Sequence, residues 1–523
     1  MEFSRKRTIV ITIGIMSGLF MASMESTVVA TAMPTIIAQL GGLEIYSWAF
    51  SAYMLASTTT VPIYGKLADL YGRRTIYAVA MIMFLAGSML SGQARSMEQL
   101  IIFRTLQGFG AGGLMPLAFT MIGDMFSFEQ RAKMQGVFSS IWGVSSVVGP
   151  LLGGFLVDQI SWRWVFYVNV LPGLVAGVVI WLAWRDTGLV AGEKRVRIDY
   201  VGAALLFAGV VLLLLGLFAL GTAQGWAMLA VAMLMLAALI WVEQRVEDPI
   251  LPLPLFRNRL FTTACLHGLL SGGAMFGSIS FIPLFVQVER GASATAAGAM
   301  LTPVIIGWVT ASTIGGRLLL KIGYRTLVLV GVVLLTIGAF MMTRVDATTS
   351  QVALISYLAM MGLGMGASVP AFLIAVQSAV RRRQMGTATA TIQFSRNMGG
   401  AIGVSVMGVV LALTLAANLT AVGIDPDSVD TNALLDSESA AEVEISAEAE
   451  AALSDAIRSV FVVALVGAAA ALAVSTLAPR GSIAQMEADR LADEAAASQM
   501  IAGEAIPSEP AVPTEQVASP GAD

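Results

Sequence analysis

The sequence predicts an all-α, polytopic membrane protein, and three observations lead to this fold class. Of its 523 residues, 57% are hydrophobic and only 12% are charged, and the mean hydropathy is +0.80. Soluble domains carry about 25% charged residues, so this much apolar surface needs lipid to cover it. The apolar residues also fall into long runs, and the 52 glycines are typical of helices that pack closely within a bilayer.

The apolar runs set the number of predicted transmembrane helices. A helix needs about 20 apolar residues to cross a hydrocarbon layer of about 30 Å. Fourteen runs, each bounded by charged residues or turn residues, fit this length: 8–37, 47–68, 75–94, 99–126, 134–157, 163–184, 200–221, 226–243, 260–287, 296–319, 325–343, 351–378, 386–416 and 457–478. We therefore expect about fourteen transmembrane helices.

Lys and Arg are distributed unequally between alternate connections. With fourteen spans, one side collects most of the basic residues, and the other side holds only Arg95, Arg163, Arg290, Arg344 and Arg458. Basic connections stay in the cytoplasm, so the chain is expected in the cell (plasma or inner) membrane with both termini cytoplasmic. One miscounted segment would remove this imbalance, so the helix count and the charges support each other.

An internal repeat divides the chain. Gly65–Arg74 matches Gly316–Arg325, with Gly, Leu, Gly and Arg in register. The repeat predicts an N-terminal six-helix bundle over 1–190, an extra two-helix insert with its linkers over 191–255, and a C-terminal six-helix bundle over 256–478. Two such halves around a central cavity are typical of a transporter that works by alternating access.

Two acidic segments lie outside the predicted helices. Residues 416–455 hold ten acids and no base, and they predict a long acidic loop on the external side. Residues 479–523 are rich in Ala, Glu, Ser and Pro, and they predict a disordered acidic cytoplasmic tail. The remaining membrane portion is basic, which reflects topology and does not indicate nucleic-acid binding.

The residue inventory argues against several classes of site. The chain has one cysteine, Cys265, and one histidine, His267, so an intramolecular disulfide and a Cys- or His-rich metal site are excluded. It has no Gly-x4-Gly-Lys-Ser/Thr loop for ATP and no Gly-x-Ser-x-Gly nucleophile elbow. We therefore expect neither an enzyme nor a protein with a resident metal or cofactor.

Four motifs resemble the major facilitator superfamily, and within it the fourteen-helix drug:proton antiporter family. Gly65–Arg74 resembles the signature loop between the second and third helices, and Arg104–Ala111 resembles the fourth-helix motif that the family associates with proton coupling. Gly149–Gly154 resembles the fifth-helix antiporter motif, the most specific indicator of export. Met24–Pro34 is similar to the first-helix motif of the fourteen-helix members.

This resemblance implies a secondary active transporter that exchanges protons for hydrophobic or cationic small molecules and functions as a monomer in lipid. The proton gradient would drive it without a cofactor. Two positions depart from the family pattern. The first-helix acid is usually Asp and here is Glu25, and the second copy of the signature loop has Leu320 where the first has Asp69. The second departure indicates a charge lock in the N-terminal half only.

Glu25 and Arg104 are the candidate proton-coupling residues. A carboxylate as deep in an apolar run as Glu25 costs several kcal/mol unless it is protonated, paired or facing water. Arg104 is the matching intramembrane base, and its guanidinium stays charged. A change in their separation would make proton affinity depend on conformation. The alternative is structural: Glu25 is a buried hydrogen-bonded acid, and carbonyl groups and Gln107 hold Arg104.

Two further groups of residues are candidates for gating. The candidate charge lock lies at the predicted cytoplasmic end of the second helix, where a solvated loop is the alternative; it comprises Gly65, Asp69, Gly72, Arg73 and Arg74. The antiporter motif places small residues along one helix so that another helix can approach, and its proline can bend the helix. These residues are Gly149, Pro150, Gly153 and Gly154.

A last group could line a substrate cavity: Tyr53, Gln107, Trp142, Trp308, Phe372, Gln393, Phe394 and Arg396. The aromatic members suit a packed core equally well, and Arg396 could serve the cavity or helix packing. The favoured function is multidrug efflux of hydrophobic or cationic compounds. The alternatives are an exporter or facilitator of one physiological solute, such as a siderophore, sugar or lipid, and a membrane enzyme or sensor, for which no motif exists.

Overall fold

The structure is a computed structural model that describes most of the chain. The described residues are 4–41, 48–185, 199–246, 249–251, 253–290, 299–346, 348–381, 384–422, 447–482, 485, 486, 488 and 490–492. Within these ranges every regular element is a helix, which confirms the all-α class. Residues 423–446 of the predicted acidic loop and 493–523 of the predicted tail lie outside the described residues.

The helices follow one another along the chain as the apolar runs predict. Their bounds are α1 (Arg5–Leu40), α2 (Trp48–Tyr71), α3 (Arg73–Gly92), α4 (Met97–Met125), α5 (Phe128–Gln159), α6 (Trp164–Tyr167), α7 (Val170–Ala183), α8 (Tyr200–Phe218), α9 (Ala223–Glu243), η1 (Leu253–Arg257), α10 (Arg259–Arg290), α12 (Thr302–Ile322), α13 (Tyr324–Met342), α14 (Gln351–Ala379), α15 (Met385–Ala421) and α17 (Ala447–Thr476).

Twelve segments of the described chain are long and apolar enough to cross a membrane, and one of them, Trp164–Ala183, contains both α6 and α7. These segments confirm a multi-pass membrane protein. Helices α2 and α5 are not among the twelve, although they are 24 and 32 residues long. At 1.5 Å per residue, each is long enough to span a bilayer. The count of fourteen transmembrane helices therefore stays a prediction.

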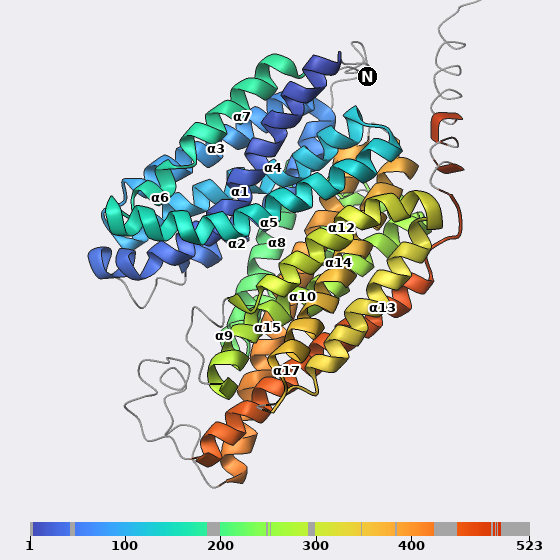
Figure 1. Cartoon of the computed structure of the whole chain (residues 1–523). Coiled ribbons are helices and arrows are strands. Elements are labelled where there is room, and N and C mark those ends of the chain that lie inside the picture. Colours follow the sequence, from blue (N-terminus) through green and yellow to red (C-terminus); the bar gives the residue numbers. More distant parts are fainter. Residues whose placement is uncertain are drawn as a thin grey trace, which may run out of the picture.

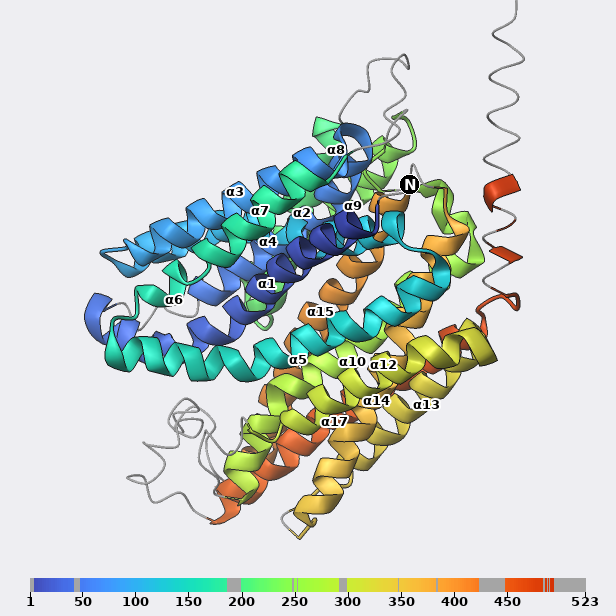
Figure 2. The same ribbon diagram turned by 45° about the horizontal axis from the view of Figure 1, so that its top comes forward.

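The helices form two groups that meet at one end of the molecule (Figure 1). Helices α1 to α7 pack among themselves, as do α10 to α17. Helix α5 contacts α12 and helix α2 contacts α15, which joins the groups. We call the end that carries the N-terminus and the end of α17 the terminal end. Away from it, the ribbons of the two groups diverge, as Figure 2 also shows.

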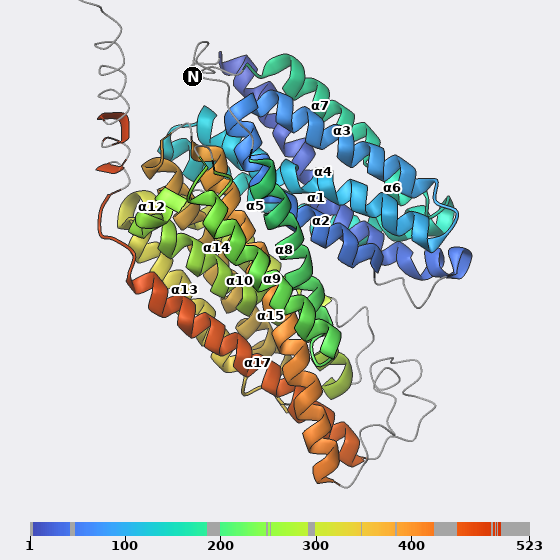
Figure 3. The same ribbon diagram turned by 180° about the vertical axis from the view of Figure 1, so that it is seen from behind.

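Helices α8 and α9 form a hairpin beside the junction of the two groups (Figure 3). Its apolar side chains Leu206, Val210 and Leu214 cluster with Leu55 of α2 and Met398 of α15. At the base of the hairpin, Asp199 accepts a hydrogen bond from the Gly202 amide, and Glu243 accepts two from the amides of Ile250 and Leu251. The hairpin therefore contacts both halves.

The flanks of the predicted acidic loop differ from expectation. Residues 416–421 continue α15 and residues 447–455 begin α17. Both stretches are rich in Ala, which favours helix, and the acids of 447–455 do not prevent it. The start of the predicted tail contacts the bundle. Tyr324 donates a hydrogen bond to the Pro479 carbonyl, and Arg490 donates one to the Gln377 carbonyl. The disorder of the tail as a whole stays a prediction.

Candidate functional site

A buried ion pair joins the first and fourth helices. Arg104 of α4 donates a hydrogen bond to Glu25 Oε1 of α1. The Glu25 side chain is 0% exposed and that of Arg104 is 1% exposed, so neither group reaches solvent. Desolvation makes two such charges costly unless they are paired and hydrogen-bonded. The structure therefore brings together the two residues proposed for proton coupling, and their role stays a proposal.

Three further groups hold Arg104 in place. Its Nη1 also donates to Gln107 Oε1 at 2.8 Å, one turn along α4, and its Nε donates to the Ala49 carbonyl at 3.3 Å. The Tyr53 ring of α2 lies 4.2 Å from the guanidinium carbon. A cation over an aromatic face is stabilised by the ring quadrupole. Tyr53 and Gln107, both candidates for the cavity, therefore belong to the environment of Arg104.

Asn169 completes the site, and sequence reasoning missed it. Its Nδ2 donates to the second carboxylate oxygen of Glu25 and also to Ser88 Oγ at 3.1 Å, and Ser88 donates to the Phe166 carbonyl at 2.9 Å. Asn169 lies where α6 gives way to α7. The available signal was a single amide side chain inside an otherwise apolar run, which marks a polar partner in the bundle.

The site leaves two polar atoms unused. Among the described residues, Gln107 Nε2 and Asn169 Oδ1 are buried and have no hydrogen-bond partner. Buried polar atoms are normally paired, so each of these two atoms could take a partner that this arrangement does not supply. Here one spare donor and one spare acceptor belong to the two amides that contact the Glu25–Arg104 pair. The arrangement can therefore accommodate a change in charge or hydrogen bonding at Glu25.

A second polar cluster joins the two halves at the terminal end. The Asp69 carboxylate accepts hydrogen bonds from the Gly386 amide at 3.0 Å and from the Thr387 amide and hydroxyl, each at 2.7 Å. These donors lie in the first turn of α15, where a helix attracts negative charge. Arg73 bridges Asp69 at 2.8 Å and Asp124 of α4 at 3.0 Å. The cluster thus links α2, α4 and α15.

The structure explains why two positions of the signature loop, 65 and 72, carry glycine. Gly65 lies against α15, where an added Cβ would come within 2.9 Å of the Gly386 carbonyl oxygen. Gly72 turns the chain between α2 and α3 with φ +90°, a conformation that side chains disfavour. Arg74, the remaining residue of the candidate charge lock, lies with its guanidinium carbon 4.1 Å from the Trp181 ring centroid of α7. It therefore contacts the N-terminal half.

Helices α5 and α12 make the other junction between the halves. The hydroxyls of Ser139 and Ser312 lie 2.6 Å apart and are hydrogen-bonded. Farther from the terminal end, the Trp142 and Trp308 rings have centroids 6.1 Å apart. Trp142 is 36% exposed, so this aromatic pair lies at the edge of the packed junction. The two tryptophans proposed for the cavity therefore meet across the halves.

The Ser139–Ser312 contact gives a test of this junction. With Ser139→Cys and Ser312→Cys in one chain, oxidation is expected to form a disulfide that joins the halves, and reduction should break it; electrophoretic mobility before and after reduction measures the cross-link. The native Cys265 is buried, so it should not interfere. The control pair is Ser140→Cys with Ser312→Cys, because Ser140 is exposed and bonds its own helix at Gly136. Equal cross-linking of both pairs would contradict this junction.

The remaining cavity candidates lie apart from the Glu25–Arg104 pair and from the α5–α12 junction. The Phe372 ring is 1% exposed and packs with His267 and Tyr324 in the core of the C-terminal half, so its role in a cavity stays a prediction. Gln393 is also buried. Phe394 packs beside the α8–α9 hairpin. Arg396 is partly exposed, and its Nε has no hydrogen-bond partner among the described residues.

The antiporter motif lies within α5, on its contact with α1. Gly149 and Gly153 are buried, and the neighbouring Leu156 packs in a cluster with Met24 and Val28 of α1. Gly154 faces open space, where nothing lies within 4 Å of an added Cβ. A neighbouring atom therefore does not require glycine at position 154. The side chain of the fourth motif residue, Pro150, lies outside the described side chains.

Comparisons with known proteins agree with this arrangement. A model of the Major Facilitator Superfamily matches residues 15–404. Multidrug transporter protein MdtP of Bacillus subtilis is 41% identical over 414 residues, which cover 78% of this chain and 75% of that protein. Multidrug resistance protein 3 of Bacillus subtilis is 38% identical over 406 residues, covering 76% and 79%.

The comparison of structures concerns the fold alone. The crystal structure of the human organic anion transporter MFSD10 aligns with a TM-score of 0.60 at 16% identity, covering 89% of this chain and 100% of that chain. The structure of the proton:xylose symporter XylE aligns with a TM-score of 0.59 at 13% identity, covering 92% and 98%. Together with the family model and the two bacterial relatives, this likeness establishes that the chain belongs to the Major Facilitator Superfamily.

Proposed function

We propose that this protein is a proton-coupled antiporter of the fourteen-helix drug:proton family, and that it exports hydrophobic or cationic compounds from the cell. The observation that carries the proposal is the buried Glu25–Arg104 pair with its two amide partners. Ionisable groups inside a membrane bundle mark ion or proton pathways. The relatives named as multidrug proteins support this class of substrate.

Glu25 would carry the proton and would also be the anionic partner of a cationic substrate. When the carboxyl is ionised, Arg104 and Asn169 donate to its two oxygens, as in this structure. When it is protonated, its O–H needs an acceptor. A half-turn of the Asn169 amide would present Oδ1, which has no partner here, to that O–H. The same residues can therefore serve both protonation states.

The Asp69 cluster would set the conformation in which this exchange occurs. It closes the terminal end by binding the first turn of α15, and the α5–α12 junction lies on the same side of the molecule. If both termini lie in the cytoplasm, as we propose, the terminal end is the cytoplasmic end and this conformation would be closed toward the cytoplasm. Release of these contacts would let the halves rock, so that Glu25 exchanges its proton and its substrate on opposite sides in turn.

The proposed topology predicts the location of three fused reporters. Reporters at residue 190 and after residue 480 are expected in the cytoplasm, and one near residue 435 is expected outside, because the basic connections lie on the cytoplasmic side. Reporter activity in intact cells measures these positions. Finding the reporters at 435 and 480 on the same side would contradict the fourteen-helix arrangement.

Dye transport in vesicles tests the proposed function itself. Purified protein in liposomes is to be given an imposed proton gradient and a panel of cationic and neutral fluorescent dyes. We expect uphill movement of several cationic dyes, which a protonophore should abolish. Transport of a single physiological solute with no response to the dyes would instead support the alternative of a dedicated exporter or facilitator.

A further inference from the structure

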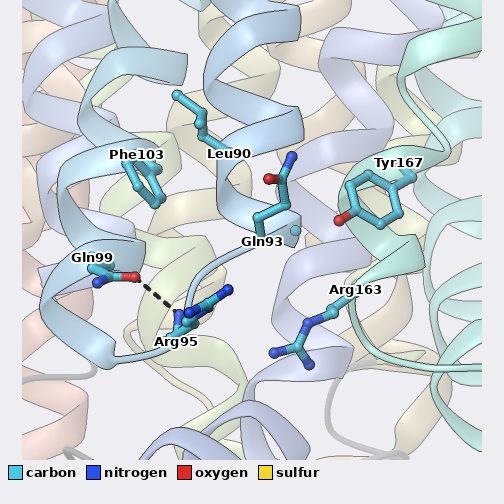
Figure 4. A pocket seen from close by; sticks show the side chains of 8 residues that line it. Leu90, Gln93, Arg95, Gln99, Phe103, Arg163 and Tyr167 are labelled. Carbon is cyan, nitrogen blue, oxygen red and sulfur yellow. Dashed lines mark hydrogen bonds between the residues drawn. The ribbon is translucent and has the colours of Figure 1, made fainter.

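A basic pocket lies away from the Glu25–Arg104 site, near the opposite end of the N-terminal half. It has a volume of about 400 Å³ (Figure 4). Its lining includes the arginines of two different connections, Arg95 between α3 and α4 and Arg163 between α5 and α6, together with Gln93, Gln99 and Tyr167. A pocket of this size can take a small-molecule group.

The two guanidinium groups face the same pocket. In Figure 4 the side chains of Arg95 and Arg163 extend toward each other across the pocket. Within the described part of the chain, neither arginine forms a salt bridge, and the Arg95 guanidinium makes no hydrogen bond. The nearest acids in the sequence, Glu98 and Asp158, do not line the pocket. Two cations that face one space, with no salt bridge to any described residue, favour an anionic ligand.

The contacts of one arginine, Arg163, hold its guanidinium in a fixed position that suits a phosphate group. The Arg163 guanidinium lies 4.4 Å from the Trp162 ring centroid, and its Nη2 donates to the Ala94 carbonyl at 3.2 Å. These contacts hold the guanidinium in position and leave other N–H groups for a ligand. Arginine binds phosphate through two parallel N–H groups. A guanidinium that is already held in position makes this pair of hydrogen bonds most readily.

The surroundings of the pocket indicate the depth of the lipid headgroups. Trp164 is 49% exposed and packs edge-on against Tyr167, with ring centroids 5.9 Å apart. Tryptophan and tyrosine gather where the bilayer meets water. Ile102 of α4 and Met89 of α3, each close in sequence to a lining residue, are 63% and 44% exposed. The pocket thus combines a polar, basic interior with apolar side chains on nearby helix surfaces.

We propose that this pocket binds the phosphate of an anionic phospholipid headgroup from the leaflet at that end of the bundle. Arg95 and Arg163 would bind the phosphate oxygens, Gln93, Gln99 and Tyr167 would contact the remaining polar atoms, and Ile102 and Met89 would lie along the acyl chains. Arginine binds phosphate oxygens through charge-assisted hydrogen bonds, and this chemistry is the same in either leaflet. The site is separate from the coupling residues and does not depend on the direction of transport.

The test measures the thermal unfolding of the full chain in detergent while a ligand is titrated. The probes are dihexanoyl phosphatidylglycerol, dihexanoyl phosphatidylcholine and inorganic phosphate. We expect phosphatidylglycerol to raise the melting temperature at the lowest concentration, because the choline cation is repelled and phosphate alone lacks the acyl contacts. If inorganic phosphate were equally potent, the bound phosphate would not come from a lipid. If phosphatidylcholine were equally potent, the pocket would not select its ligand by negative charge.

Substitutions locate the effect in the pocket. Arg95→Ala should weaken the apparent affinity for phosphatidylglycerol roughly tenfold or more, because a hydrogen bond to a charged group is lost. Arg163→Lys keeps the charge, and so preserves folding, but loses the paired N–H groups and should also weaken binding. The control is Arg344→Ala, an exposed arginine near the far end of α13 that does not line the pocket. Unchanged affinity in Arg95→Ala, or an equal loss in the control, would overturn the proposal.

Discussion

Glu25→Gln is expected to abolish proton-driven uphill transport of cationic dyes. The amide has nearly the same shape as the carboxyl and can still accept a hydrogen bond from Arg104, but it can neither bind nor release a proton. It also removes the anion that would attract a cation, so cationic dyes should bind more weakly, whereas neutral compounds should bind nearly as before. Uptake into liposomes under an imposed proton gradient measures the first effect, and dye binding to purified protein measures the second.

Two companion variants separate coupling from folding. Glu25→Asp restores the acid that the family usually has, and it should retain transport with a shifted pH optimum. Removing one partner of a buried ion pair costs roughly 3–5 kcal/mol because the other charge stays buried. Glu25→Gln combined with Arg104→Gln removes both charges, so it should recover thermal stability without recovering coupling. Uphill transport by Glu25→Gln would instead leave the pair with a structural role.

Asp69→Asn is expected to weaken closure of the terminal end. The carboxylate accepts three hydrogen bonds from α15 and bridges Arg73. Asparagine has one acceptor oxygen, and its NH2 group would face donors. Losing hydrogen bonds to a charged group costs about 1.5–3 kcal/mol each, so the ratio of closed to open molecules should fall roughly tenfold or more. The readout is the yield of the Ser139→Cys, Ser312→Cys disulfide, followed by the transport rate.

The matched control for this variant is Asp158→Asn. It removes the same charge from the far end of α5, where Asp158 is exposed and has no hydrogen-bond partner among the described residues. We expect cross-linking and transport to stay at wild-type levels in the control. Wild-type cross-linking and transport in Asp69→Asn as well would mean that Asp69 does not hold the closed state.

The sequence predicted the fold class and the central pair because both follow from strong physical constraints. Long apolar runs have no stable alternative to membrane helices. An acid and a base that are both buried in such helices need partners, and Glu25 and Arg104 are each other's partner across 79 positions of sequence. Asp69 and Arg73 were predicted because their motif is local.

Other features depend on distant contacts that a single sequence does not show. Asn169 joins the site because the chain changes from α6 to α7 there. Asn169 and Pro172 are local signals of this break, but neither shows that the Asn169 amide reaches Glu25. The prediction for Phe372 could not be made specific, because α14 is buried on every side from Gly364 to Ser378. A helix without a polar face gives no periodicity from which to infer the side that faces a cavity.

The central claim is that one carboxyl, that of Glu25, binds either a proton or a cationic substrate. Proton release on substrate binding tests it most directly, in purified protein at low buffer capacity near neutral pH. Adding a saturating cationic dye to the wild-type protein is expected to release up to one proton per molecule, while Glu25→Gln should bind the dye weakly and release none. Equal proton release from Glu25→Gln and the wild type, at dye concentrations that saturate both, would contradict the claim.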